Sequence, residues 1–206
     1  SSTITASLTI TPIFRLKACT AAEPDLVCIA TKPGLLETER ELMQRPEPWH
    51  GHCQLQFNSD ASGRSRHQGG CTAPFKLMRA EAGDDGRCEL PRLHTAGGLV
   101  GGDQLSIDLM LHSGSRSLIT SVAAQKVYGS IGRSRLQPDG IWARQEVTAK
   151  LSSHSDLEWL PQELVLYADA LYEQNLSVTL PEDASFLSTE IVRLGRTAAG
   201  EQLNRG

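Results

Sequence analysis

Apolar and polar residues alternate over many stretches of the chain after residue 48. In the first of these, 49–57, every second residue is apolar or small and the residues between are polar. Because successive side chains of a β-strand point to opposite faces, this alternation predicts a strand with one buried face. The predicted buried face carries Trp49, Gly51, Cys53, Leu55 and Phe57, and the other face carries His50, His52, Gln54 and Gln56.

A unit made of an alternating stretch, a short polar turn and a second strand then recurs three times. The three units run over 105–120, 145–160 and 176–194. Their starts are unevenly spaced, which excludes an array of fixed period. The pattern predicts an all-β protein with few or no helices, and it leaves open a sandwich or a β-solenoid with insertions.

Two other segments remain to be assigned to secondary structure. Leucines in 157–173 also fit a helical spacing, but Pro161 interrupts them and the β-branched and aromatic residues nearby favour strands. Residues 59–70 are rich in Ser, Gly and Arg, so we expect a polar loop there, and then a turn and a short strand within 69–79.

The first part of the chain has a different character. Weak alternation at 4–10 is followed by a charged, helix-prone piece at 35–45, and then by Pro46 and Pro48. A residue before proline is pushed out of the helical region, so the prolines indicate a boundary. We therefore divide the chain into an N-terminal extension of uncertain order, residues 1–48, and a β domain, residues 49–206.

The glycine-rich stretch 93–103 carries four glycines within six residues, between His94 and Asp103. Glycines so placed provide positive φ angles or a close approach of the backbone to another group. The stretch lacks the Gly-Lys-Ser/Thr ending of a phosphate loop, and a strand pattern follows it where a dinucleotide fold needs a helix. We expect a wide turn that feeds a strand, in which Asp103 either accepts hydrogen bonds from the turn amides or faces a ligand.

Composition narrows the class of protein. The net charge of −4 excludes a general binder of nucleic acid, and residues 4–16 are too polar and too short for a secretion signal or a membrane span. Five cysteines, an odd number without close pairs, indicate reduced thiols. These features predict a soluble, cytoplasmic protein.

Charge is divided unevenly along the β domain. Six basic residues and two acidic ones occupy 116–150, whereas 151–192 holds eight acidic residues and no Lys or Arg. One interpretation is a solvated acidic surface. The other is a polar interior or interface that handles cations, because carboxylates without basic partners attract metal ions or a basic protein face.

Catalytic signatures are absent from the chain. It contains no Gly-x-Ser-x-Gly elbow, no His-Glu-x-x-His sequence and no closely paired cysteines. His50 and His52 would point the same way from a strand and could share a metal ion, but they lack a third ligand, and a solvated face is the simpler interpretation.

Five strings, taken together, resemble the urease accessory protein UreD family, called UreH in some bacteria. In chain order they are 69–76 (GGCTAPFK), 93–103 (LHTAGGLVGGD), 124–128 (AQKVY), 157–163 (LEWLPQE) and 195–201 (GRTAAGE). The resemblance covers residues 49–201. Residues 1–48 do not resemble the family, and family members continue through further strands, so we expect a β domain that lacks its C-terminal part.

The resemblance implies a fold related to a right-handed β-helix and a protein that is not an enzyme. Such proteins act with the accessory proteins F and G, dock on the urease apoprotein and pass nickel through an internal tunnel. The resemblance implies neither a stably bound cofactor nor a nucleic-acid or membrane partner. Two alternatives stay open, namely a scaffold without metal passage and a β-helical carbohydrate-active enzyme that uses Glu158 and Glu163.

A nickel route differs from a nickel store. Clusters of imidazole and thiolate would trap Ni²⁺, whereas several weak oxygen sites in series can admit the ion and release it. We therefore expect no stable metal site. The predicted groups along the route are His94, Asp103, Glu158, Glu163, Asp169 and Glu190.

Overall fold

A computed structural model describes residues 3–10 and 48–203, which are built almost entirely of β-strands. Within these ranges the only helix is one 3-10 turn, η1 (Thr197–Ala199). The prediction of an all-β protein with few or no helices is confirmed. No helix in the described ranges is long and apolar enough to cross a membrane.

Three sheets make up this structure. Sheet A has the order β1 (Thr3–Ile10), β13 (Tyr172–Pro181), β10 (Ala143–Leu151), β7 (Gln104–Leu111), β2 (His50–Ser59) and β3 (Ser65–Cys71). Sheet B has the order β14 (Ser185–Ser188), β11 (Asp156–Leu160), β8 (Arg116–Ser121), β6 (Cys88–His94) and β4 (Phe75–Leu77), and β5 (Glu81–Ala82) pairs with β6. Sheet C consists of β15 (Val192–Leu194), β12 (Leu164–Leu166) and β9 (Gln125–Val127).

Successive strands repeat as triplets. The chain runs β7–β8–β9, then β10–β11–β12, then β13–β14–β15, and each strand pairs in parallel with its equivalent in the next triplet. In sheet A, for example, Val147 lies opposite Ile107 on one side and Leu176 on the other. The three predicted strand pairs are present as the first two strands of each triplet. The third strands form sheet C: β12 lies in the stretch 157–173 for which strands were favoured, β15 lies at the end of the third predicted unit, and β9 was not predicted.

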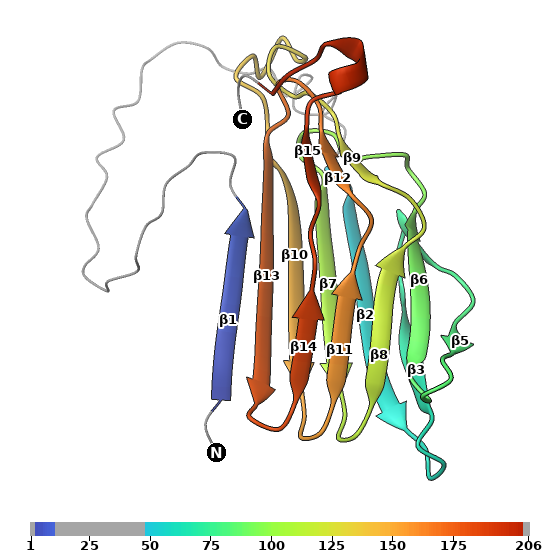
Figure 1. Cartoon of the computed structure of the whole chain (residues 1–206). Coiled ribbons are helices and arrows are strands. Elements are labelled where there is room, and N and C mark those ends of the chain that lie inside the picture. Colours follow the sequence, from blue (N-terminus) through green and yellow to red (C-terminus); the bar gives the residue numbers. More distant parts are fainter. Residues whose placement is uncertain (1–2, 11–47, 204–206) are drawn as a thin grey trace, which may run out of the picture.

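Sheets A and B form two layers joined by short turns at one end, and sheet C lies toward the other end (Figure 1). The core lies between the layers, because the alternating apolar residues of both sheets point inward. Phe57, Leu90, Leu111 and Leu157 are each fully buried there. Burying a side chain of this size contributes about 1.5–3 kcal/mol, so this core is the main source of stability.

The alternation at the start of the β domain is confirmed in β2. Cys53, Leu55 and Phe57 are buried, whereas Gln54 and Gln56 are exposed. Trp49, which precedes the strand, remains 45% exposed despite its place in the pattern.

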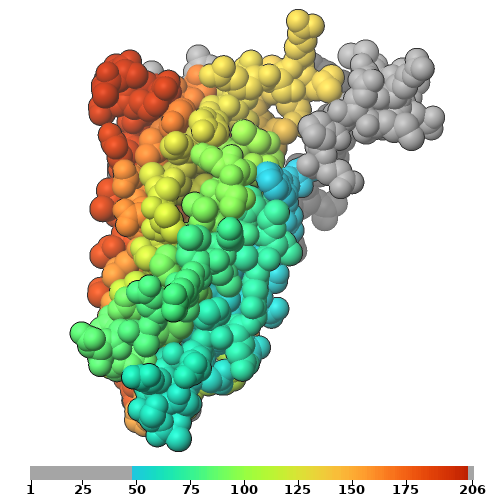
Figure 2. Space-filling view, turned by 90° about the vertical axis from the view of Figure 1, so that its right-hand side faces the viewer, coloured from blue at the N-terminus to red at the C-terminus, as the bar shows by residue number. Residues whose placement is uncertain are grey.

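The prediction of a loop over 59–70 is wrong for its second half, which forms strand β3. This strand pairs antiparallel with β2, with Leu55 opposite Gly69. Most of its residues are exposed, because it is an edge strand with few apolar side chains to bury in the core. A strand of this kind shows no alternation, so only its pairing with β2 reveals it. Figure 2 shows the edge of the molecule that carries β3 and β5, with the C-terminal segment at an upper corner.

The N-terminal extension is described only at residues 3–10. They form β1, which pairs antiparallel with β13 at the edge of sheet A. Residues 11–47, including the helix-prone piece at 35–45, lie outside the described residues, so the predicted division at residue 48 stays a prediction.

The glycine-rich stretch is a turn that joins β6 to β7, as predicted. Its Leu99 N–H donates to the Lys126 carbonyl (2.8 Å) and its Leu99 carbonyl accepts from the Tyr128 N–H (2.9 Å), so the turn lies against sheet C. A Cβ on Gly101 would lie 2.2 Å from Ser130 Oγ and 2.7 Å from the Ile141 carbonyl oxygen. Glycine is needed here because the backbone of the next loop passes too close for a side chain.

Candidate functional site

A row of polar side chains occupies the inner face of sheet A at the end next to sheet C. Gln145 of β10 is 5% exposed and its Cα lies opposite that of Gln174 in β13. Gln145 Nε2 donates to Gln174 Oε1 (3.1 Å), and the hydroxyl of Tyr172 donates to the same oxygen (2.9 Å). Gln174 Nε2 in turn donates to Glu190 Oε1. One hydrogen-bonded row therefore links β10, β13 and the segment that follows β14.

The strand period explains this placement. Gln145 follows Ala143 by two residues and precedes Val147 by two, so all three point into the core. Tyr172 and Gln174 share the inner face of β13 with Leu176 in the same way. On both strands the inward glutamine is followed by inward apolar residues, Val147 on β10 and Leu176 on β13.

Burial changes the acidity of two groups in this row. It raises the pKa of the Glu190 carboxyl, against a smaller lowering effect of the hydrogen bond from Gln174. It also raises the pKa of the Tyr172 hydroxyl well above its usual range, and the nearby Glu190 charge adds to this effect. Tyr172 is therefore a neutral hydrogen-bond donor, and Glu190 takes up a proton more readily than a carboxyl in water.

Arg92 and His94 of β6 face the same region from sheet B. Arg92 is 5% exposed, and its guanidinium carbon lies 5.0 Å from the ring centroid of Trp159 and 5.5 Å from that of Phe75. The Arg92 charge lowers the pKa of Tyr172, which places the two within electrostatic reach. We call Gln145, Tyr172, Gln174, Glu190, Arg92 and His94 the polar interior.

His94 is a neutral imidazole in this setting. Its ring meets that of Phe75 edge to face, with the centroids 6.3 Å apart. Burial lowers the pKa of His94, the neighbouring Arg92 charge lowers it further, and Asp103 acts in the opposite direction. The imidazole therefore has one donor and one acceptor nitrogen to offer.

Several buried atoms of the polar interior have no hydrogen-bond partner in the part of the chain that the structure describes. They are Arg92 Nε, His94 Nδ1, His94 Nε2 and Gln145 Oε1. Buried polar atoms are normally satisfied by protein groups or by ordered water, and leaving them unsatisfied is costly. This end of the interior is therefore suited to hold water or small polar ligands.

Asp103 has the structural contact that was one of its two predicted roles. Its Oδ2 accepts a hydrogen bond from the Val100 N–H (2.9 Å), which closes the glycine-rich turn. Its charge also acts on His94, so it lies near the polar interior as well. The turn and the polar interior thus meet at one carboxylate.

We expect Asp103→Ala to lower the free energy of unfolding by about 1 kcal/mol, because the Val100 N–H loses its acceptor. Asp103→Asn should lower it less, since the amide oxygen can still accept. Urea unfolding followed by circular dichroism measures both. Equal stabilities for wild type and both variants would show that this hydrogen bond does not support the turn.

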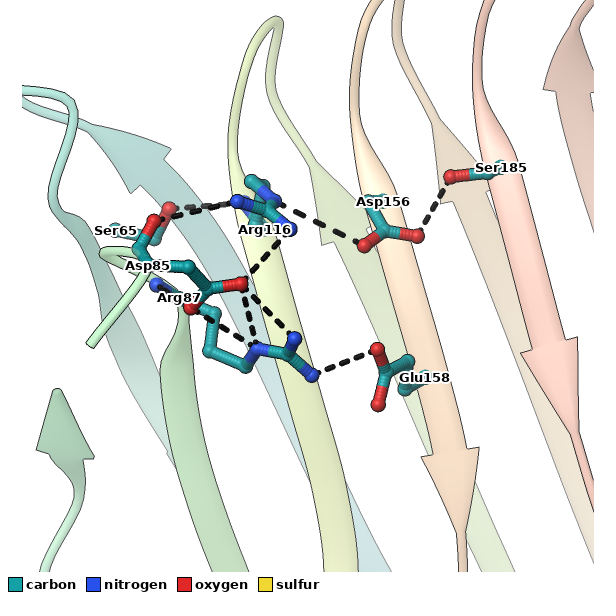
Figure 3. Close-up of polar contacts among 7 residues, drawn as sticks. All are labelled: Ser65, Asp85, Arg87, Arg116, Asp156, Glu158 and Ser185. Atoms are coloured by element: carbon teal, nitrogen blue, oxygen red, sulfur yellow. Dashed lines mark hydrogen bonds and ion pairs between the residues drawn. The ribbon is translucent and has the colours of Figure 1, made fainter. Parts of the chain in front are cut away.

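Glu158 and Glu163 lie on the outer surface, each beside an arginine. Glu158 Oε1 accepts from Arg87 Nη1 (2.7 Å), within a network that spans β5–β6, β8 and β11 (Figure 3). Glu163 Oε1 lies 3.8 Å from Arg193 Nη1. Neither carboxylate joins the polar interior.

The interpretation of 151–192 as carboxylates without basic partners is wrong in three dimensions. Arginines from other segments lie beside several of them: Arg87 beside Glu158, Arg116 beside Asp156 (3.9 Å) and Arg144 beside Glu173 (3.0 Å). Parallel pairing places β8 beside β11 and β10 beside β13, so Arg116 and Arg144 of the basic segment lie beside carboxylates of the acidic one.

Asp169 lies in the turn between β12 and β13, with a φ of 60°. Its carbonyl accepts hydrogen bonds from the N–H groups of Ser130 (2.8 Å) and Ile131 (3.2 Å). Its backbone therefore holds the loop before β10 in place. Of the six predicted residues, the structure brings His94 and Asp103 together and places Glu190 in the polar row.

Sequence reasoning missed Arg92, Gln145, Tyr172 and Gln174. The available signal was a polar residue at an inward position of an alternating strand, such as Gln145 between Ala143 and Val147. The alternation shows that such a position is buried. It does not show which strands face one another.

The histidine pair of β2 lies on the outer face of sheet A. His52 Nε2 lies 2.8 Å from Asp108 Oδ2, and His50 Nε2 lies 2.9 Å from Ser106 Oγ. The two histidines thus have separate partners on β7. Residues 3–10 and 48–203 contain no group of three or more His, Cys, Asp or Glu placed to hold a metal ion.

Four of the five strings meet around sheet C. The Tyr128 hydroxyl donates to the Gly97 carbonyl (3.4 Å), which joins 124–128 to the glycine-rich turn. The Gln125 N–H donates to the Glu163 carbonyl (2.9 Å), which joins it to 157–163. Glu201 Oε1 accepts from the Ala168 N–H (2.8 Å), which anchors 195–201 beside β12. The fifth string joins them through Phe75, which contacts His94.

Comparison with known proteins agrees with the five strings. Residues 50–206 match the family model described as UreD urease accessory protein. The chain is 74% identical over 164 residues to the urease accessory protein UreD of Parasynechococcus marenigrum (strain WH8102), an alignment that covers 80% of this chain and 52% of that protein. It is 71% identical over 170 residues to UreD of Synechococcus sp. (strain WH7805), covering 80% and 53%.

The chain spans about half the length of these curated relatives. The match nevertheless includes all five strings, the polar interior and every described strand from β2 onward. The chain belongs to the UreD family of urease accessory proteins.

Proposed function

We propose that this protein is a non-enzymatic factor of urease maturation, acting in the cytoplasm. It docks on the urease apoprotein together with the accessory proteins F and G. What supports this is membership of a family whose curated relatives are named urease accessory proteins. The stacked strand triplets support a further proposal about the fold, that they are coils of a right-handed β-helix-like arrangement.

We further propose that nickel passes through the polar interior. The observation that carries this proposal is the hydrogen-bonded row of Gln145, Gln174 and Glu190, which lies with Arg92 and His94 at one end of a largely apolar interior. Amide, hydroxyl and carboxyl oxygens are weak ligands for Ni²⁺ compared with imidazole or thiolate clusters. Groups of this kind suit an ion that must enter and leave, and nickel is here a cargo rather than a resident cofactor.

Glu190 is the residue of the row with the greatest expected effect on nickel transfer. Glu190→Gln removes the only carboxylate in the row, so we expect nickel per urease to fall several-fold while the complexes still assemble. The experiment co-expresses the chain with apo-urease, F and G, and measures co-purification and the nickel content of urease. Glu158→Gln is the matched control, because it removes a carboxylate from the outer surface, and its nickel content should stay at the wild-type level.

The alternative is a scaffold of the activation complex without metal passage. Gln145→Leu separates the two, since it replaces a buried polar group by an apolar one of similar size. If both Glu190→Gln and Gln145→Leu leave nickel loading unchanged in assembled complexes, the scaffold is correct and the passage is not. If the wild-type chain co-purifies with none of these partners, the proposed docking fails as well.

A further inference from the structure

Arg92 is a buried cation without an anionic partner among residues 3–10 and 48–203. It is 5% exposed, and its Nε is fully buried without a hydrogen-bond partner within these ranges. Arg87 and Arg116, which are partly exposed on the outer side of sheet B, each lie beside carboxylates. Arg92 is thus an exception within its own sheet.

A buried guanidinium is stabilised when an anion lies beside it. Arginine stays protonated in proteins, so burial cannot remove its charge. The rings of Phe75 and Trp159 offset part of the charge through cation–π contacts. Aromatic faces do not satisfy the five directed N–H donors of a guanidinium, and water would satisfy donors without cancelling the charge. A small anion would do both.

His94 is the second polar side chain of the candidate anion site. It lies two residues after Arg92 on the same strand face, and both of its ring nitrogens are buried without a hydrogen-bond partner among the described residues. A neutral imidazole presents one donor and one acceptor. The pair therefore offers a cationic fork beside an imidazole that can donate one hydrogen bond and accept another.

We propose that Arg92 and His94 bind a small planar oxyanion of the carboxylate class, with bicarbonate as the best match. Two oxygens of such an ion accept the forked N–H bonds of a guanidinium, a geometry that a spherical halide cannot use. The hydroxyl of bicarbonate complements the acceptor nitrogen of His94. This inference rests on these two side chains and does not depend on nickel passage.

The test measures bicarbonate binding to the 206-residue chain. Sodium bicarbonate is titrated against sodium chloride at fixed pH and ionic strength, with the thermal midpoint and the ¹³C linewidth of labelled bicarbonate as readouts. We expect saturable binding, and a folded-to-unfolded ratio that rises about tenfold when bicarbonate is at ten times its Kd. Arg92→Met should abolish the saturable effect, whereas Arg144→Met, which removes an outer arginine that is 61% exposed, should keep it.

Three results would overturn the proposal: no saturable effect in the wild-type chain, an equal effect of chloride, or an unchanged effect in Arg92→Met. If Arg92→Met does not fold, Arg92→Lys and His94→Phe test the bicarbonate site in its place. Arg92→Lys keeps the charge but loses the fork, and His94→Phe keeps the ring contact with Phe75 but loses both nitrogens. Each should weaken bicarbonate binding several-fold, and wild-type affinity in both would contradict the assignment.

Discussion

Replacing Trp159 by alanine is expected to lower the free energy of unfolding by about 3–5 kcal/mol. Trp159 is 4% exposed on the inner face of β11, where its ring packs between the two layers and covers the Arg92 guanidinium. Its removal leaves a cavity and also takes a cation–π partner from a buried charge. Both effects lower the free energy of unfolding.

Urea unfolding followed by far-ultraviolet circular dichroism measures this change without relying on the tryptophan signal. Leu187→Ala is the matched control, because Leu187 lies on β14 in the same sheet but is 53% exposed. It should change stability by no more than about 0.5 kcal/mol. A loss below about 1 kcal/mol in Trp159→Ala would contradict the described packing of the inner face.

Gly69→Ala is expected to cost about 2–4 kcal/mol, because it combines backbone strain with a steric clash. Gly69 has a φ of +108°, and a Cβ there would lie 2.1 Å from the carbonyl oxygen of Gln54 on the paired strand. Relieving the clash would separate β3 from β2, so part of the sheet would lose its hydrogen bonds.

The adjacent glycine provides the control for this prediction. A Cβ on Gly70 meets no atom within 4 Å, so Gly70→Ala should stay within about 0.5 kcal/mol of wild type. Unfolding of the two variants is compared under identical conditions. Similar stabilities would show that the pairing of β3 with β2 tolerates a side chain at position 69, contrary to the described register.

The bicarbonate and nickel proposals depend on different residues of the polar interior. The first depends on Arg92 and His94 in sheet B, and the second on Gln145, Gln174 and Glu190 between the sheets. A fixed positive charge repels a passing cation, so an oxyanion bound at Arg92 would also reduce that repulsion. The two experiments use different variants and readouts, so either proposal can fail alone.

The sequence by itself determined the strand pairs and their buried faces. Alternation with period two depends only on the local chain, and it correctly indicated the inward residues of β2, β7 and β10. The five strings likewise indicated the family without any structure. The glycine-rich turn was predicted as a turn because its glycines and the strand pattern after it are local signals.

Only the tertiary structure decided which of these faces meet. Sheet C is built from strands of three residues each, too short to show a period, and β3 is exposed on most of its length. The arginine partners of Glu158 and Glu163 come from positions 71 and 30 residues away. Likewise, Arg92 of β6 meets Trp159 of β11 only because β8 joins these two strands in sheet B, and it lies near Tyr172 only because sheets A and B pack face to face. Charge pairing and the polar interior depend on contacts between distant segments, and a local pattern carries no information about such contacts.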